Sequence, residues 1–138
     1  MPEQPEVHAL LDRELPGLLG VIGTNSEAGY PHLVPVWYRW DGSAVHIWTE
    51  ESRFWVSNLV RDPQVGFSVQ EPEEPWAAVT LKGRASVETG DSQEIDAEIR
   101  RITRRYVPAS EVQGYIRGYP GLRTIVHISP AKILFRSD

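Results

Sequence analysis

The sequence predicts a mainly β protein, an antiparallel β-barrel of six strands with helices at its periphery. Short apolar or alternating segments are separated by turn residues, among them Asp41 and Gly42, a pair typical of two-residue hairpins. Helical periodicity is confined to a few segments that lie between these strands. Tight connections favour antiparallel pairing over a parallel sheet, and closure into a barrel removes exposed strand edges.

The first elements are a short helix and an apolar strand. Residues 5–15 place Val7 and Leu11 at helical spacing, and Pro16 ends this pattern. Residues 18–24 are compact and apolar, and a loop rich in turn residues follows them. We therefore expect a helix that leads directly into the first strand.

A hairpin and a second helix follow. Residues 32–40 and 44–49 are expected to pair around the turn at Asp41. Ser52 is a residue type that favours a helix start, and the apolar positions that follow predict a helix to about residue 60. The hairpin and this helix are the part of the chain richest in aromatic residues.

The next two strands enclose an acidic loop. Residues 64–70 alternate between apolar and polar side chains, as expected for a strand with one buried face. Residues 71–75 are acidic and rich in proline, and a long strand is predicted over residues 76–88.

The last third of the chain is expected to contain two helices and a final strand. Asp91 is the predicted cap of a helix that extends to about residue 106, with one buried stripe. A second short helix is predicted at residues 110–119, and a strand at residues 122–135 that is bent or interrupted at Pro130. The stripe consists of Ile95, Ile99, Ile102 and Tyr106.

Composition limits the classes of function. At 138 residues the chain is expected to be a single domain spanning residues 1–138. A net charge of -5 argues against a general nucleic-acid binder. The chain has no cysteine, and the spacing of His32, His46 and His127 does not indicate a metal site. The first residues do not resemble a signal peptide, and no apolar run is long enough to cross a bilayer. We therefore expect a cytoplasmic protein with neither a nucleic-acid nor a membrane partner.

Two neighbouring segments carry the functional signal. Residues 34–40 form a strand with large aromatics, and residues 47–55 form a strand that ends in hydroxyl groups and an arginine where a helix begins. A flat aromatic surface beside a helix start suits a planar ligand that carries a phosphate. The spacing therefore points to a phosphorylated, ring-containing cofactor.

Five segments, in this order, resemble the pyridoxamine 5'-phosphate oxidase-like family, in particular its short flavin- and deazaflavin-dependent oxidoreductase branch. The resemblance extends from about residue 18 to residue 135. It implies a six-stranded antiparallel split β-barrel of the FMN-binding type, assembled as a homodimer with its cofactor sites at the subunit interface. The segments are residues 29–37 (GYPHLVPVW), 49–53 (TEESR), 58–65 (NLVRDPQV), 81–85 (LKGRA) and 128–133 (ISPAKI).

The same resemblance implies the residues that hold the cofactor. The strand of Pro35, Val36 and Trp37 would lie along the ring system. The phosphate would be held by the segment that connects the next strand to its helix. Its predicted contacts are Thr49, Ser52 and Arg53.

Three further positions belong to this expected site. Phe54 occupies the position where family members commonly have a lysine, and Glu50 and Glu51 add negative charge nearby. Arg53, Lys82 or an arginine of the partner would then compensate. Trp76 is expected either to reach the site from the partner chain or to close its substrate side.

The resulting hypothesis is an oxidoreductase that uses bound F420 or FMN for hydride transfer to or from a small organic substrate. The cofactor supplies the ring chemistry, so no side chain is assigned as catalytic. The alternative is a non-catalytic split barrel that binds flavin through a degenerate phosphate site. The arginines at positions 100, 101, 104 and 105 are either a solvated helix face or a basic rim for the oligoglutamate tail of F420.

Overall fold

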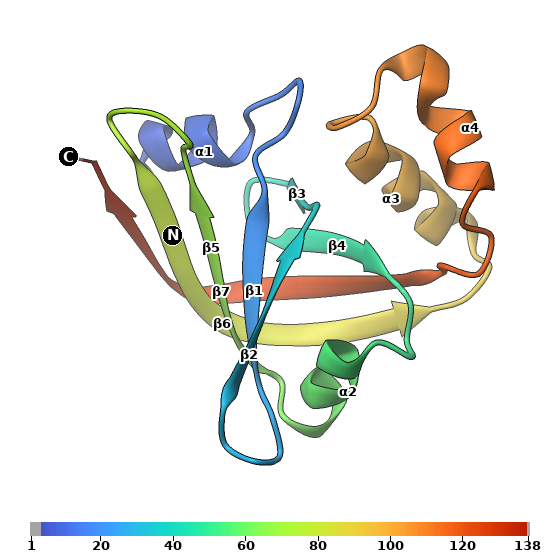
Figure 1. The fold of residues 1–138 in the computed structure, drawn as a ribbon, viewed down its shortest axis with the longest axis horizontal. Coiled ribbons are helices and arrows are strands. Elements are labelled where there is room, and N and C mark those ends of the chain that lie inside the picture. The colour runs from blue at the N-terminus through green and yellow to red at the C-terminus, as the bar shows by residue number, and fades with distance from the viewer. Residues whose placement is uncertain (1–3, 138) are drawn as a thin grey trace.

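The structure is a computed structural model that describes residues 4–137, and it confirms the mainly β fold (Figure 1). The described part contains one antiparallel sheet of seven strands, in the order β2-β1-β5-β6-β7-β4-β3, curled into a half-barrel. The strands are β1 (Gly20–Asn25), β2 (Pro31–Val36), β3 (Arg39–Trp40), β4 (Val45–Thr49), β5 (Gln64–Gln70), β6 (Ala78–Thr89) and β7 (Thr124–Arg136). The helices are α1 (Pro5–Leu11), α2 (Phe54–Arg61), α3 (Gln93–Thr103), the 3-10 turn η1 (Ala109–Glu111) and α4 (Val112–Arg117).

The expected strand count of six was one too low, because residues 32–40 do not form a single strand. The chain breaks at Trp37 and Tyr38, so that β2 pairs with β1 whereas β3 pairs with β4. These two strands lie at opposite ends of the sheet order. The two residues between them carry the chain from one edge of the sheet to the other, which brings both edges of the half-barrel into proximity.

The long strands β6 and β7 pair along most of their length at the centre of the curved sheet (Figure 1). Their register shifts between Lys82 and Gly83, opposite Pro130, where the sequence predicts a bend. A side chain at Gly83 would collide with the carbonyl oxygen of Ser129 and would place its Cβ 2.9 Å from the Cα of Pro130. Glycine therefore permits the two backbones to approach each other at this bulge.

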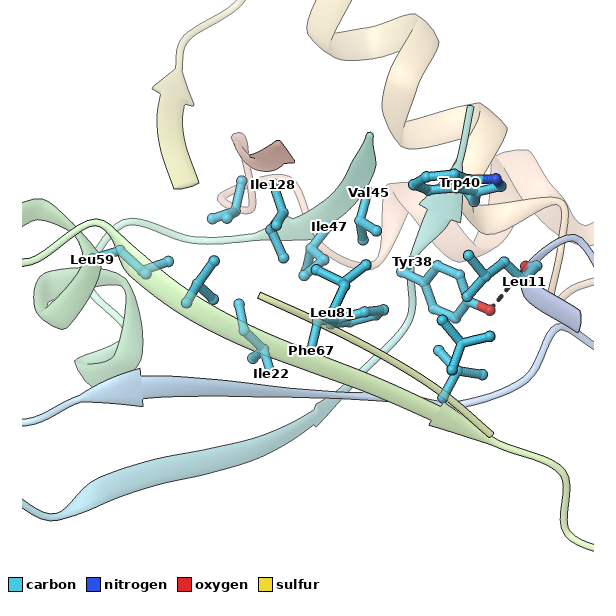
Figure 2. Close-up of a cluster of buried hydrophobic side chains, with 14 of the residues drawn as sticks. Leu11, Ile22, Tyr38, Trp40, Val45, Ile47, Leu59, Phe67, Leu81 and Ile128 are labelled. Carbon is cyan, nitrogen blue, oxygen red and sulfur yellow. Dashed lines mark hydrogen bonds between the residues drawn. The ribbon is translucent and has the colours of Figure 1, made fainter. Parts of the chain in front are cut away.

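The interior of the half-barrel is filled by alternate residues of the strands and by Tyr38 (Figure 2). The Tyr38 ring packs edge-on against Phe67 at 5.2 Å between centroids, and its hydroxyl donates a hydrogen bond of 2.8 Å to the carbonyl of Leu11. This bond satisfies a buried phenol and attaches the C-terminal end of α1 to the core. Fully buried aliphatic residues of this cluster are Leu11, Ile22, Ile47, Leu81 and Ile128.

Helix α3 covers the outer face of β4 and β7 with the predicted stripe. Ile95, Ile99 and Ile102 are buried and pack against Ile125 of β7. The predicted cap was wrong by one residue, because Ser92 accepts a hydrogen bond of 3.2 Å from the backbone N–H of Ile95. No helix among residues 4–137 is both long and apolar enough to span a membrane.

A chain of four polar groups crosses the same outer face beside α3. The imidazoles of His46 and His127 lie opposite each other in the β4–β7 register, with their Nδ1 atoms 2.7 Å apart. The Nε2 of His46 lies 2.7 Å from a carboxylate oxygen of Asp41, and the Nε2 of His127 lies 3.0 Å from Glu88. These contacts join the β3–β4 turn to the strands behind it.

Replacing Asp41 with Asn is expected to lower stability at neutral pH. Burial alone would raise the pKa of Asp41, but hydrogen bonds from His46 and from the backbone N–H groups of Ser43 and Ala44 hold it well below its ordinary value. A depressed carboxyl pKa contributes stability above about pH 4 that is lost as the pH falls toward the folded-state pKa. Urea unfolding should therefore show a constant difference between wild type and Asp41→Asn at neutral and weakly acidic pH, and the two should converge as the pH falls below about 4. A difference that stays constant with pH would contradict this assignment.

Candidate functional site

A cavity of about 520 Å³ opens where β2, β4 and the start of α2 meet the aromatic side of α4. Cavities of this size are typical of small-molecule and cofactor sites. Most of its wall is aromatic or aliphatic, and its polar side chains are few. The lining residues are His32, Val34, Pro35, Val36, Trp37, Trp48, Thr49, Arg53, Phe54, Trp55, Ile102, Tyr115, Tyr119 and Leu122.

Six of the nine predicted site residues line this cavity. They come from two places, the C-terminal half of β2 with its continuation and the connection from β4 into α2. Strands β2 and β4 lie near opposite ends of the sheet order. Both line one cavity because the sheet curls. The six are Pro35, Val36, Trp37, Thr49, Arg53 and Phe54.

The other three predicted residues lie outside the cavity of the single chain. The Ser52 hydroxyl donates a hydrogen bond of 3.1 Å to the Glu50 carboxylate. Trp76 lies in the loop between β5 and β6, is 43% exposed and has a positive φ of 59°. Lys82 is exposed on β6. Contact of these residues with a ligand would require a second copy of the chain or a rearrangement of the 50–53 segment.

Sequence reasoning missed the side of the cavity formed by Trp48 and α4. Trp48 lines the cavity and donates a hydrogen bond of 2.7 Å from its indole N–H to the carbonyl of Leu122. Tyr115 and Tyr119 lie opposite, with ring centroids 5.2 Å apart. Their spacing of four along the chain was the available signal, since it places both rings on one side of a helical turn.

The indole ring of Trp37 packs against two tyrosine rings. Its indole stacks on Tyr106 at 4.6 Å with an interplanar angle of 7°, and on Tyr115 at 5.3 Å and 28°. Burial raises the pKa of the Tyr115 phenol, and the hydrogen bond with Tyr119 raises it further. The two tyrosines thus flank the Trp37 indole, and the raised pKa keeps the Tyr115 phenol protonated at neutral pH.

The start of α2 gives one end of the cavity its charge. The helix begins at Phe54, so the N-cap is Arg53 and not Ser52, and no side chain caps the first N–H groups. The Arg53 guanidinium lies 3.6 Å from the Glu50 carboxylate, and Phe54 is 63% exposed and makes a T-shaped contact with the ring of His32. Uncapped N–H groups and a guanidinium favour an anion at this end, although Glu50 already offsets part of the positive charge.

The arginines at positions 100, 101, 104 and 105 do not line the cavity. Arg105 is almost fully buried, which contradicts a solvated face at this position. Arg101 pairs with Glu98 at 3.3 Å, as expected for a solvated helix face. Arg123 is engaged by Asp96 at 2.5 Å and by Asp91 at 3.2 Å. Within residues 4–137, therefore, the arginines of α3 do not form a basic rim around this cavity.

The sequence model of the family described as pyridoxamine 5'-phosphate oxidase matches residues 3–135. The chain belongs to this pyridoxamine 5'-phosphate oxidase family. The match covers the whole sheet except Arg136, the last residue of β7, and all of the cavity wall. No curated protein matches the sequence.

Several solved structures have the same fold as this chain. An F420 reductase shares 22% identity over 97% of this chain and 98% of its own, with a TM-score of 0.71. A conserved hypothetical protein from Mycobacterium tuberculosis shares 20% identity over 99% of this chain and 86% of its own, with a TM-score of 0.81. General stress protein 26 from Bacillus anthracis shares 15% identity over 94% of this chain and 90% of its own, with a TM-score of 0.69. At these identities the likeness concerns the fold of the oxidase family and not the activity of its members.

Proposed function

We propose that this chain is an oxidoreductase that binds F420 or FMN in the cavity and transfers hydride to or from a small organic substrate. The observation that carries the proposal is the union, in one cavity, of an aromatic wall and the uncapped start of α2 with Arg53. A planar ring with a phosphate on its side chain matches both ends of this space. The F420 reductase among the structural neighbours is consistent with the proposal.

In this proposal each part of the wall has a separate task. Pro35 and Val36 lie along one side of the ring, and Trp37 limits its position because the two tyrosines hold the indole in place. Thr49 and Arg53 bind the phosphate. The bound cofactor supplies the hydride chemistry, while the apolar wall excludes water from it.

A second copy of the chain would complete the site. Strands β1, β2, β5 and β6 leave a hollow of about 480 Å³ on the outer face of the sheet, with Leu19 53% and Leu33 66% exposed. A monomer rarely leaves an apolar face of this kind uncovered. We propose that a homodimer covers it, and that Trp76 and Lys82 reach the cofactor from the partner.

Charging this face should break the dimer. Leu33→Glu places a carboxylate in the proposed interface, where it would lose its hydration without gaining a partner. Light scattering coupled to gel filtration is expected to give a dimer for wild type and a monomer for Leu33→Glu. Val60→Glu is the matched control, since Val60 is 74% exposed on α2 and lies outside this hollow. A wild-type monomer would contradict the prediction.

Replacing Arg53 should weaken cofactor binding without loss of the fold. Charge-assisted hydrogen bonds to phosphate are strong, so Arg53→Gln is expected to raise the Kd for both FMN and F420 about tenfold. The exposed Arg104 provides the control substitution Arg104→Gln, for which the Kd should stay unchanged. Quenching of tryptophan fluorescence in cofactor-stripped protein measures the Kd. Equal affinity of wild type and Arg53→Gln would refute the phosphate assignment.

The alternative function is a non-catalytic flavin-binding protein. It is favoured by Phe54, which supplies no charge beside the proposed phosphate, and by Glu50 beside Arg53. Stopped-flow reduction and reoxidation of the bound cofactor with candidate acceptors separates the two functions. An oxidoreductase passes electrons to an acceptor in repeated turnovers, whereas a binding protein protects the cofactor from them.

A further inference from the structure

Two histidines that are distant in the sequence meet on the outer face of the sheet, apart from the proposed cofactor cavity. His46 on β4 and His127 on β7 are 81 residues apart in the chain but are direct partners in the β4–β7 register. Their Nδ1 atoms lie 2.7 Å apart, with the ring planes at 80° to each other. The chain has no cysteine, so paired imidazoles are the side chains best suited to bind a transition-metal ion.

The other nitrogen of each ring is hydrogen-bonded to a carboxylate. The Nε2 of His46 lies 2.7 Å from Asp41. The Nε2 of His127 lies 3.0 Å from Glu88. An ionised carboxylate only accepts hydrogen bonds, so each Nε2 carries the proton that it donates. A neutral imidazole with its proton on Nε2 has a lone pair on Nδ1, and the two lone pairs are therefore turned toward each other.

Two lone pairs at this distance require a cation between them. A shared proton meets this requirement, and so does a metal ion that both rings coordinate. The charges bonded to the rings are the carboxylates of Asp41 and Glu88, which together match the charge of a divalent ion. Beside them, Arg39 of β3 and Glu98 of α3 neutralise each other in an ion pair of 2.6 Å. The electrostatic surroundings thus favour a divalent cation at this point.

Hydrogen bonds to the carboxylates also prepare the rings as ligands. An imidazole that binds a metal usually donates its second N–H to a carboxylate, which fixes the orientation of the ring and raises its basicity. Asp41 is held in turn by the backbone N–H groups of Ser43 and Ala44, at 2.8 and 2.7 Å. The side chain of His46 is 11% exposed and that of His127 is 30% exposed. One ring is therefore fixed in the fold, and the other leaves a side open to water.

A bound ion requires only a small separation of the rings. Zinc–nitrogen bonds of about 2.0 to 2.1 Å at a tetrahedral angle place two nitrogens about 3.3 Å apart, which is about 0.6 Å more than the observed contact. The partly exposed His127 ring can turn by this amount within one rotamer well. Pairing of β4 with β7 keeps the two backbones in register while it does so.

We propose that His46 and His127 bind one divalent transition-metal ion of the Zn²⁺ or Cu²⁺ class through their Nδ1 atoms, with water at the remaining positions. Asp41 and Glu88 orient the two rings. The ion links β4 to β7 and, through Asp41, to the β3–β4 turn. Mg²⁺ and Ca²⁺ prefer oxygen ligands and do not bind here. The inference does not depend on the proposed function, because neither ring lines the cofactor cavity.

Thermal unfolding of protein without an affinity tag, in EDTA, Zn²⁺ or Mg²⁺, tests the site. An ion that binds the folded chain raises the Tm, and we expect excess Zn²⁺ to raise it by about 5 °C and Mg²⁺ to leave it unchanged. His46→Gln and His127→Gln should each abolish the Zn²⁺ shift. Glu88→Gln should weaken Zn²⁺ binding about tenfold in calorimetry. His32→Gln removes an imidazole from β2 and is the matched control, which should keep the full shift.

Each variant is compared with itself in EDTA, so a change in its own stability does not enter the shift. Electron paramagnetic resonance of the Cu²⁺-loaded protein gives a second readout, with two nitrogen ligands expected in wild type and fewer in His127→Gln. The site would be overturned by a wild type that Zn²⁺ does not stabilise, by an equal shift with Mg²⁺, or by a full shift in His127→Gln. None of these results bears on cofactor binding, so the proposed function would stand or fall separately.

Discussion

Replacing Arg105 with Met is expected to cost about 3 to 5 kcal/mol of folding stability, a large part of the total for a domain of this size. The Arg105 side chain is 3% exposed and donates to the carbonyls of Leu11 and Arg13 at 2.9 Å each. It also donates to the carbonyl of Tyr38 and lies 4.6 Å from the centroid of that ring. Methionine would fill much of the volume but would remove one buried donor from each of these three carbonyls, and the carbonyl of Leu11 would keep only the Tyr38 hydroxyl.

Arg105 matters because it joins three segments that are distant in the chain. Its guanidinium, which lies just after α3, bonds to the end of α1 and the residues that follow it and to the crossing between β2 and β3. Urea unfolding followed by tryptophan fluorescence would measure the loss. The neighbouring Arg104 is exposed, so Arg104→Met should change the free energy of unfolding by about 0.5 kcal/mol or less. Similar values for the two variants would show that the buried network contributes no stability.

Introducing a methyl group at Gly83 should be nearly as damaging, with an expected loss of about 3 kcal/mol. The added Cβ would meet the backbone of Ser129 and Pro130 and not the end of a flexible side chain. Backbone atoms in a paired strand cannot withdraw without breaking the ladder between β6 and β7. Because β6 and β7 are the longest strands of the half-barrel, a displacement of either strand would also strain the strands paired with it.

The same substitution at Gly114 is a control with the opposite sign. Gly114 lies in α4, and an added Cβ there would have no atom within 4 Å. Alanine favours a helix over glycine, so Gly114→Ala should stabilise the protein by about 0.5 to 1 kcal/mol. Thermal unfolding of both variants provides the comparison. A Gly83→Ala protein as stable as wild type would mean that the bulge relaxes to accept the side chain.

The cofactor segments could be predicted because they are short and continuous. Six predicted residues line the cavity, and five of them lie at the end of β2, directly after it, or at the start of α2. The wall opposite could not be predicted in the same way. Trp48 and Leu122 are 74 residues apart in the chain, and only the antiparallel pairing of β4 with β7 brings them together.

Arg105 shows where periodicity stops being informative. The stripe of α3 is correctly predicted through Ile102, but the helix ends at Thr103, two residues before the arginine. Beyond a helix end the spacing of 3.6 residues no longer assigns a face, so a residue that periodicity places off the buried stripe can turn inward. Its burial depends on carbonyl groups supplied by Leu11 and Tyr38, far away in the chain.

The sequence by itself determined the elements and their buried faces, because strand alternation, helical spacing and turn residues are local properties. It also determined the family, since five short segments in order are enough for that match. Only the tertiary structure decided that residues 32–40 divide between the two edges of the sheet, that His46 meets His127, and that Trp48 meets Leu122 at the cavity. These features arise from contacts between distant segments, whose geometry is set by how far the sheet curls and not by any local pattern.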